Sequence, residues 1–253
     1  MEVVGYGAAR QQRFELTRTA AGAPTVVLVH GGFWQAGYGL DLMQPLVPSL
    51  VAAGWTVANI DYRGVGDDGG GWSGTFEDAA AATDALAAID GIDVRRIVTV
   101  GHSAGGHLAV WLAGRHRLPD GAPGASPQVR PIGALSQAGV VDLVAAAEAR
   151  LGDGATQSLL GGEPSEVPDR YAIGSPAALV PIGVPVELVH GVDDRIVPPD
   201  QSRRYDDVTR AVGDPVVRTE VPGDHFTMID PATDAWAACV AGIRRLLAPH
   251  LVL

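Results

Sequence analysis

The strongest constraint on the fold of this chain is an alternation of short apolar runs with helical patterns along 253 residues. Apolar, often β-branched residues predict strands at 13–19, 24–30, 55–62, 95–101, 130–137, 185–191 and 215–223. Helical patterns occupy 40–54, 75–89, 103–116, 200–213 and 232–248. Because each strand is nearly all apolar, helices must cover both faces of the sheet, and the alternation requires right-handed crossovers. The sequence predicts an α/β fold with a mostly parallel, twisted sheet, in which 13–19 is the antiparallel exception.

One long segment interrupts this alternation. Residues 140–185 are rich in Gly, Pro and Ala, and only 142–154 and 155–162 have weak helical patterns. Insertions of this kind between strands often form caps or binding loops. A small cap and a plain surface excursion are both compatible with the pattern. No repeat and no linker divides the chain, so we expect one domain over residues 1–253.

Composition and charge narrow the classes of partner. The chain is 47% hydrophobic and 19% charged, as in an ordinary globular protein, and its 29 acidic and 18 basic residues give a net charge of −11. This charge argues against nucleic acid or an anionic membrane as the main partner. Cys239 is the only cysteine and lies in an apolar-periodic segment, which predicts a buried structural thiol. The seven histidines lack ligand spacing, so we expect neither a metal nor a cofactor.

The N-terminal residues "MEVVGYGAARQQRFEL" have no basic region followed by an apolar one, so no signal peptide is predicted. No apolar run is long enough to cross a bilayer. We therefore expect a cytoplasmic monomer or homodimer whose partner is a small-molecule substrate.

The segment "VTVGHSAGG" places a serine between glycines where a predicted strand meets a predicted helix. It fits the nucleophile-elbow pattern G-x-S-x-G, in which a sharp turn presents the hydroxyl. Gly101 and Gly105 remove side chains that would collide in such a turn, and the helix N-terminus favours developing negative charge. Ser103 is therefore the candidate nucleophile, and the following amide, of Ala104, is a candidate oxyanion donor.

A serine hydroxyl needs a base, which in this architecture follows the last strand. His225 lies there, directly after a Pro-Gly turn, and is the candidate base. His30 and His190 end strands beside glycine-rich loops, which favours a bracing role. The other histidines are weaker candidates because they occupy the variable elbow position, the following helix or the C-terminal end: His102, His107, His116 and His250.

The base needs a carboxylate that fixes its tautomer. Asp193 and Asp194 follow a predicted strand and precede His225, and Asp142 follows an earlier one. Spacing alone does not choose among the three.

Backbone donors for an oxyanion are expected in "HGGFW", residues 30–34, because glycines directly after a strand let amides approach a substrate oxygen. A competing motif, "GVGDDG" at 64–69, formally satisfies the dinucleotide pattern G-x-G-x-x-G. Asp67 and Asp68 would occupy the pyrophosphate position, and no helix follows. A flexible loop at the rim of the site is the better interpretation.

Taken in order, HGGFW, GHSAGG, HGVDDRIVP and PGDHF resemble the motifs of the α/β-hydrolase superfamily, over almost the whole chain. The acid of many members lies in H-G-x-x-D-x-x-V-P, which implies Asp194. The HGG[FY]W form is similar to that of small esterases related to kynurenine formamidase (arylformamidase). In such relatives the second glycine and the next residue supply the oxyanion amides, which implies Gly32 and Phe33 here.

These residues together predict a metal-free serine hydrolase that cleaves small carboxylic esters or arylformamides, such as N-formylkynurenine, through an acyl-enzyme on Ser103. A generic short-chain carboxylesterase is the main alternative, followed by a peptidase and by a non-catalytic binding protein of the same fold. Aromatic and apolar residues near the motif loops are candidates for an apolar pocket, with ordinary packing as the alternative: Phe33, Trp34, Trp72, Phe226 and Met228.

Overall fold

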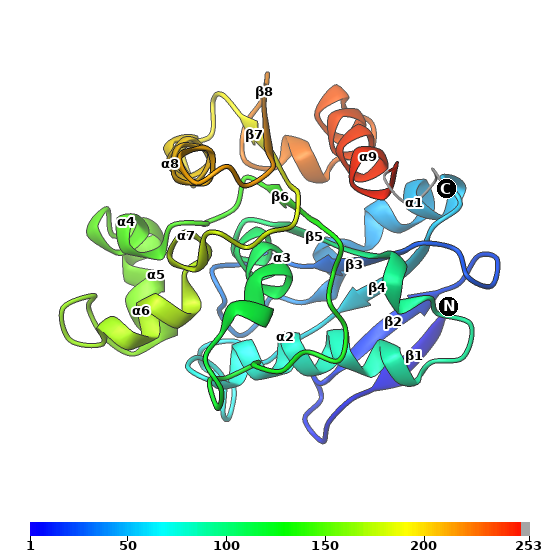
Figure 1. The fold of residues 1–253 in the computed structure, drawn as a ribbon, viewed down its shortest axis with the longest axis horizontal. Helices are drawn as coiled ribbons and strands as arrows, with labels where there is room; N and C mark the ends of the chain where they lie inside the picture. Colours follow the sequence, from blue (N-terminus) through cyan, green and yellow to red (C-terminus); the bar gives the residue numbers. More distant parts are fainter. Residues whose placement is uncertain (249–253) are drawn as a thin grey trace.

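The computed structural model describes residues 1–248, which form one eight-stranded sheet with helices packed on it (Figure 1). The strands are β1 (Glu2–Gly5), β2 (Arg13–Thr17), β3 (Thr25–Val29), β4 (Thr56–Ile60), β5 (Ile97–His102), β6 (Ala134–Gln137), β7 (Val186–Gly191) and β8 (Val216–Val221). Their order in the sheet is β1-β2-β4-β3-β5-β6-β7-β8. β2 pairs antiparallel with β1 and β4, and all the other pairs are parallel. The predicted parallel sheet and its antiparallel exception are confirmed.

The strand β1 is the one that the sequence patterns missed. It has four residues, ends at Gly5, is largely exposed and lies at the edge of the sheet. An exposed edge strand has little apolar pattern to reveal it.

The long helices are α2 (Gly74–Ala85), α3 (Ala104–Gly114), α8 (Asp200–Ala211) and α9 (Asp234–Leu247), close to the predicted segments. The predicted helix over 40–54 is broken into η1 (Leu40–Leu42), η2 (Gln44–Leu46) and α1 (Val47–Ala52). Pro45 and Pro48 cause the breaks, since proline has no amide hydrogen for a helical turn. The remaining 3₁₀ turns are η3 (Leu86–Ala88), η4 (Val94–Arg96), η5 (Arg115–Arg117) and η6 (Thr227–Ile229).

The central strands bury both faces. In β3, Val27 and Val29 belong to a core shared with α2 and α3, whereas Val26 and Leu28 belong to a core shared with α1 and α9. Cys239 lies in the second core as a free, buried thiol, as predicted. None of the helices in the described residues is both long and apolar enough for a transmembrane span.

Residues 140–185 form four helices rather than two: α4 (Leu143–Glu148), α5 (Leu151–Leu160), α6 (Pro168–Gly174) and α7 (Pro176–Leu179). They gather at one side of the molecule near α8 (Figure 1). The segment is tied to α3, because His107 Nε2 lies 2.8 Å from the Gly174 carbonyl oxygen and Trp111 Nε1 donates to the Ile173 carbonyl at 3.0 Å. It is therefore packed onto the body of the protein.

Candidate active site

Ser103 lies at the turn between β5 and α3 with φ 57° and ψ −120°, outside the usual regions for a residue with a side chain. A Cβ on Gly101 would lie 2.0 Å from the Gly105 carbonyl oxygen, and one on Gly105 would lie 2.1 Å from the Val29 carbonyl oxygen. Neither position accepts a side chain, as the elbow pattern predicts. Ser103 is only 3% exposed, less than an elbow serine is expected to be, because the neighbouring loops close around it.

The candidate base and acid lie on the loops after β8 and β7. His225 Nδ1 is 2.6 Å from Asp194 Oδ2, and both residues are buried. Asp194 Oδ1 accepts the amides of Ile196 and Val197, each at 2.9 Å. Burial raises the pKa of Asp194, but hydrogen bonds from His190 and His225 outweigh it and hold this pKa below its usual value. The carboxylate is therefore ionised and fully hydrogen-bonded.

The other two candidate acids lie elsewhere. Asp193 is exposed, and Asp142 caps the N-terminus of α4 by accepting the Ala145 amide at 3.0 Å. Neither contacts His225, so the geometry favours Asp194.

His102 joins the base to the elbow, a contact that the sequence did not reveal. Its Nε2 lies 2.8 Å from the His225 carbonyl oxygen, and the two rings lie 4.5 Å apart. Burial, followed by the nearby His225, lowers the pKa of His102 to about 3. The neutral ring therefore donates from Nε2 and holds the His225 loop beside Ser103. Within residues 1–248, His225 Nε2 has no hydrogen-bond partner, so it is free to act on a bound substrate.

The loop after β3 has three consecutive residues with left-handed backbone: Gly32 (φ 106°), Phe33 (φ 50°) and Trp34 (φ 56°). In the described part of the chain, the Gly32 and Phe33 amides donate to no protein acceptor. A Cβ on Gly31 would lie 3.1 Å from Ser103 Cβ, so this loop lies directly against the candidate nucleophile. Ala104 opens α3, and its amide has no partner one turn earlier. Three unpaired amides thus lie on the two segments that meet at Ser103.

Two neighbours brace this strained loop. His30 stacks on Tyr62 with ring centroids 4.1 Å apart, and its Nδ1 lies 2.8 Å from the Gly31 carbonyl oxygen. The loop at 64–71 binds from the other side, since the Val65 amide donates to the Trp34 carbonyl at 2.6 Å. The segment that resembled a dinucleotide motif therefore supports the loop of the candidate oxyanion donors Gly32 and Phe33.

Two of the pocket candidates lie where ordinary packing, the alternative interpretation, would place them. Trp34 is 1% exposed, and its Nε1 donates to His107 Nδ1 at 3.1 Å, because the left-handed backbone turns the indole into the core. Met228 is fully buried in the core that contains Cys239.

Two other pocket candidates, Trp72 and Phe226, remain at least partly accessible to solvent. Trp72 is half-buried against Phe76 and lies 5.9 Å below the Arg170 guanidinium. Phe226 is 55% exposed and borders a cavity beside His225. His250, one of the weaker candidates for the base, lies outside the described residues.

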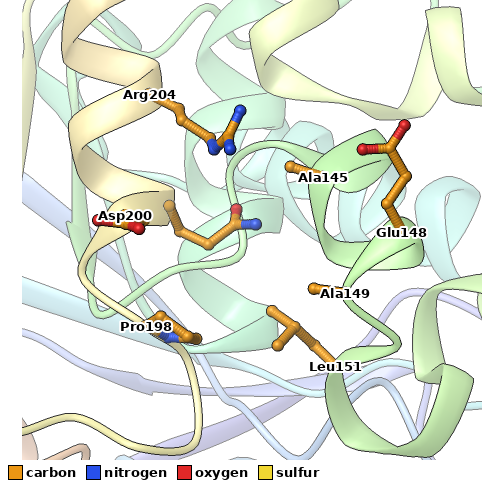
Figure 2. A pocket seen from close by; sticks show the side chains of 8 residues that line it. Ala145, Glu148, Ala149, Leu151, Pro198, Asp200 and Arg204 are labelled. Atoms are coloured by element: carbon orange, nitrogen blue, oxygen red, sulfur yellow. The ribbon is translucent and has the colours of Figure 1, made fainter.

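The segment 140–185 reaches the site at the start of α5. A Cβ on Gly152 would lie 2.7 Å from the Phe33 ring, so the chain packs directly against the loop of the candidate oxyanion donors. A cleft of about 360 Å³ opens between α4 and α8, where Glu148 and Arg204 face it from opposite sides (Figure 2). None of Ser103, Asp194 and His225 lines this cleft. No group of three or more potential metal ligands occurs among the described residues.

The sheet order, the elbow and the loops after β7 and β8 define an α/β-hydrolase, and solved structures share this fold. Residues 15–208 match the BD-FAE family, an α/β-hydrolase esterase family, and the chain belongs to it. Esterase LipC of Mycobacterium tuberculosis is 29% identical over 225 residues, which cover 83% of this chain and 55% of that protein. The chain thus spans about half the length of this curated relative.

Among solved structures, Esterase B from Lactobacillus rhamnosis superposes with a TM-score of 0.82 at 23% identity, covering 98% of this chain and 86% of that one. A truncated carbohydrate esterase from gut microbiota gives 0.82 at 20% identity, with 97% and 95% covered. A propionate-bound thermophilic esterase from Thermogutta terrifontis gives 0.74 at 23% identity, with 99% and 93% covered. Likeness at these identities establishes the fold, and the resemblance to arylformamidases is not confirmed by these matches.

Proposed function

We propose that this protein is a serine carboxylesterase that hydrolyses small acyl esters through an acyl-enzyme on Ser103. The observation that carries the proposal is the 2.6 Å contact of His225 Nδ1 with Asp194, which leaves Nε2 of the imidazole free, while His102 holds the His225 loop next to the elbow. The BD-FAE membership and the esterase relatives support ester hydrolysis as the reaction class.

In this mechanism Ser103 attacks the ester carbonyl while His225 Nε2 takes the hydroxyl proton. The carbonyl oxygen gains negative charge and accepts hydrogen bonds from the free amides of Gly32, Phe33 and Ala104. The tetrahedral intermediate then collapses, and His225 gives its proton to the departing alcohol oxygen. Water, activated by the same histidine, hydrolyses the acyl-enzyme and restores the serine.

Arylformamides form the narrower alternative. A formyl group needs little acyl space, and an aniline leaves more readily than an alkylamine. The likeness of HGGFW to the arylformamidase motif is the support for this substrate, whereas the matched relatives are esterases. We therefore rank a short-chain carboxylesterase first.

The test compares wild type with Ser103→Ala and with the exposed-serine control Ser165→Ala. We expect an alkyl phosphonate to label wild type and Ser165→Ala at Ser103, and p-nitrophenyl acetate hydrolysis to fall by at least about 10⁴-fold in Ser103→Ala. Full activity in Ser103→Ala would refute the proposal. Comparing kcat/KM for N-formylkynurenine, p-nitrophenyl acetate and p-nitrophenyl butyrate ranks the substrates, and a strong preference for the formamide would reverse our order.

A further inference from the structure

A second cavity, of about 300 Å³, adjoins His225 and is formed by the loops after β7 and β8. Its lining residues are Asp193, Arg195, Ile196, Asp224, His225 and Phe226. Phe226 is 55% exposed and Ile196 is 38% exposed. Large apolar side chains that remain open to solvent beside a reactive group are typical of a binding surface.

The Phe226 ring is held in place rather than loosely exposed. It packs edge-on against the His225 ring, with centroids 5.3 Å apart and an interplanar angle of 80°. Its amide donates to Asp224 Oδ1 at 3.0 Å, and its carbonyl accepts the Ile229 amide at 3.0 Å. A ring fixed in this way loses little conformational entropy when a ligand packs on it.

The positions that the reaction requires for the two ester oxygens assign one part of the substrate to this cavity. The carbonyl oxygen must face the Gly32 and Phe33 amides, whereas the departing oxygen must lie next to His225, which protonates it. The alcohol portion of the ester therefore leaves along the His225 side of Ser103. We propose that the cavity beside Phe226 binds this alcohol portion and selects an aromatic ring without negative charge there, an inference that rests on the proposed esterase function.

The lining explains the preference for an aromatic ring without negative charge. Phe226 and Ile196 offer apolar surface on which an aromatic ring can pack edge-on or offset. Two carboxylates, of Asp193 and Asp224, stand at the rim against one guanidinium, of Arg195. This excess of negative charge disfavours a leaving group that carries a carboxylate or phosphate. The volume is at the lower end of the range for small-molecule sites and suits a single ring.

The kinetic test places a ring on either side of the ester bond. Benzyl and ethyl acetate share the acyl group and have alcohols of similar acidity, so their kcat/KM ratio reports recognition of the alcohol. Methyl phenylacetate carries the ring on the acyl side, and methyl acetate is its counterpart without a ring. We expect Phe226→Ala to lower the benzyl-to-ethyl ratio about tenfold, mainly through KM, and Ile196→Ser to lower it less. Phe226→Tyr should retain the ratio.

Val212→Ala is the matched control, because Val212 is 52% exposed at the C-terminal end of α8 and lines neither the site nor the cavity. An unchanged benzyl-to-ethyl ratio in Phe226→Ala overturns the proposal. A drop confined to the methyl phenylacetate ratio also overturns it, since the ring would then bind on the acyl side.

A binding measurement separates this inference from the esterase proposal. Saturation-transfer NMR on Ser103→Ala should detect benzyl alcohol, and the signal should disappear in the Ser103→Ala, Phe226→Ala double variant. No signal in the first protein, or an equal signal in both, refutes the subsite. If wild type hydrolyses none of the four esters, the proposed function fails while the NMR result still decides the subsite.

Discussion

His190 Nε2 lies 3.3 Å from Asp194 Oδ2, the oxygen that also contacts His225. The same nitrogen lies 2.8 Å from the Val197 carbonyl oxygen, so it carries the hydrogen, and Nδ1 accepts from the Ser202 hydroxyl at 2.7 Å. His190 is fully buried. A second histidine thus fixes the carboxylate that orients the first, which makes His190 a candidate positioning residue.

Replacing His190 with Phe keeps a buried ring but removes the donor to Asp194. We expect kcat for p-nitrophenyl acetate to fall about tenfold with little change in KM, since a hydrogen bond to a charged group contributes about 1.5 kcal/mol. His190→Gln, which keeps a donor, should recover part of the loss. If His190 acts through Asp194, adding His190→Phe to Asp194→Asn should cost little more. Equal losses in both backgrounds would show instead that His190 serves the fold in general.

The glycines of the elbow give a prediction about stability. A Cβ at Gly105 would meet the carbonyl oxygens of Val29 and His30 at 2.1 and 2.4 Å, and backbone cannot move aside as a side chain can. We expect Gly105→Ala to lower the free energy of unfolding by at least about 3 kcal/mol, measured by urea denaturation. Gly22→Ala is the control, because Gly22 has φ 71° but no atom within 4 Å of the added Cβ. It should cost about 1 kcal/mol, and equal costs at both positions would contradict the steric explanation.

Gly152 links the 140–185 segment to turnover. Its added Cβ would meet the Phe33 ring at 2.7 Å, and moving that ring disturbs the loop that holds the proposed oxyanion donors Gly32 and Phe33. We expect Gly152→Ala to lower kcat for p-nitrophenyl acetate about tenfold. Gly121→Ala adds a methyl group to another left-handed glycine, with φ 82° and open space around it, and should leave kcat unchanged. If the two variants have equal kcat, the segment does not control the oxyanion loop.

The burial of His107 predicts that the folded protein loses stability in mild acid. Burial lowers its pKa to about 4, and its Nδ1 must stay unprotonated to accept from Trp34. Between about pH 6.5 and 4 the unfolded chain binds a proton that the folded protein does not, so stability falls as pH falls. We expect His107→Gln to reduce the slope of unfolding free energy against pH by up to about 1.4 kcal/mol per pH unit. Parallel curves for the two proteins in urea titrations from pH 6.5 to 4.5 would contradict this.

The sequence predicted the sheet, and it singled out the turn of Ser103 and the contacting pair Asp194 and His225, because these depend on local patterns. Apolar strands and glycine turns are visible in short windows, and parallel strands bring their carboxyl ends to one edge. The supporting contacts were not predictable. His102 binds the carbonyl oxygen of His225, 123 positions away, and the contact of His190 with Asp194 depends on how the loop after β7 folds back on its own strand. Trp34 was misplaced because its orientation depends on backbone angles that the motif letters do not specify.

The segment 140–185 also has features that the sequence indicates and features that it does not. α6 and α7 have proline in their first turn, a signal that the weak apolar periodicity obscured. The contact of Gly152 with Phe33 joins residues 119 positions apart, which no local pattern reveals.

The position of β8 in the sheet affects how the protein loses activity on warming. Ser103 follows β5 in the middle of the sheet, whereas His225 follows β8, an edge strand that pairs with β7 alone and is largely exposed. Edge elements with few buried contacts open at a lower free-energy cost than central strands. Fraying of this edge of the sheet separates His225 from Ser103 while the central strands stay folded. Warming should therefore inactivate the protein reversibly before it melts.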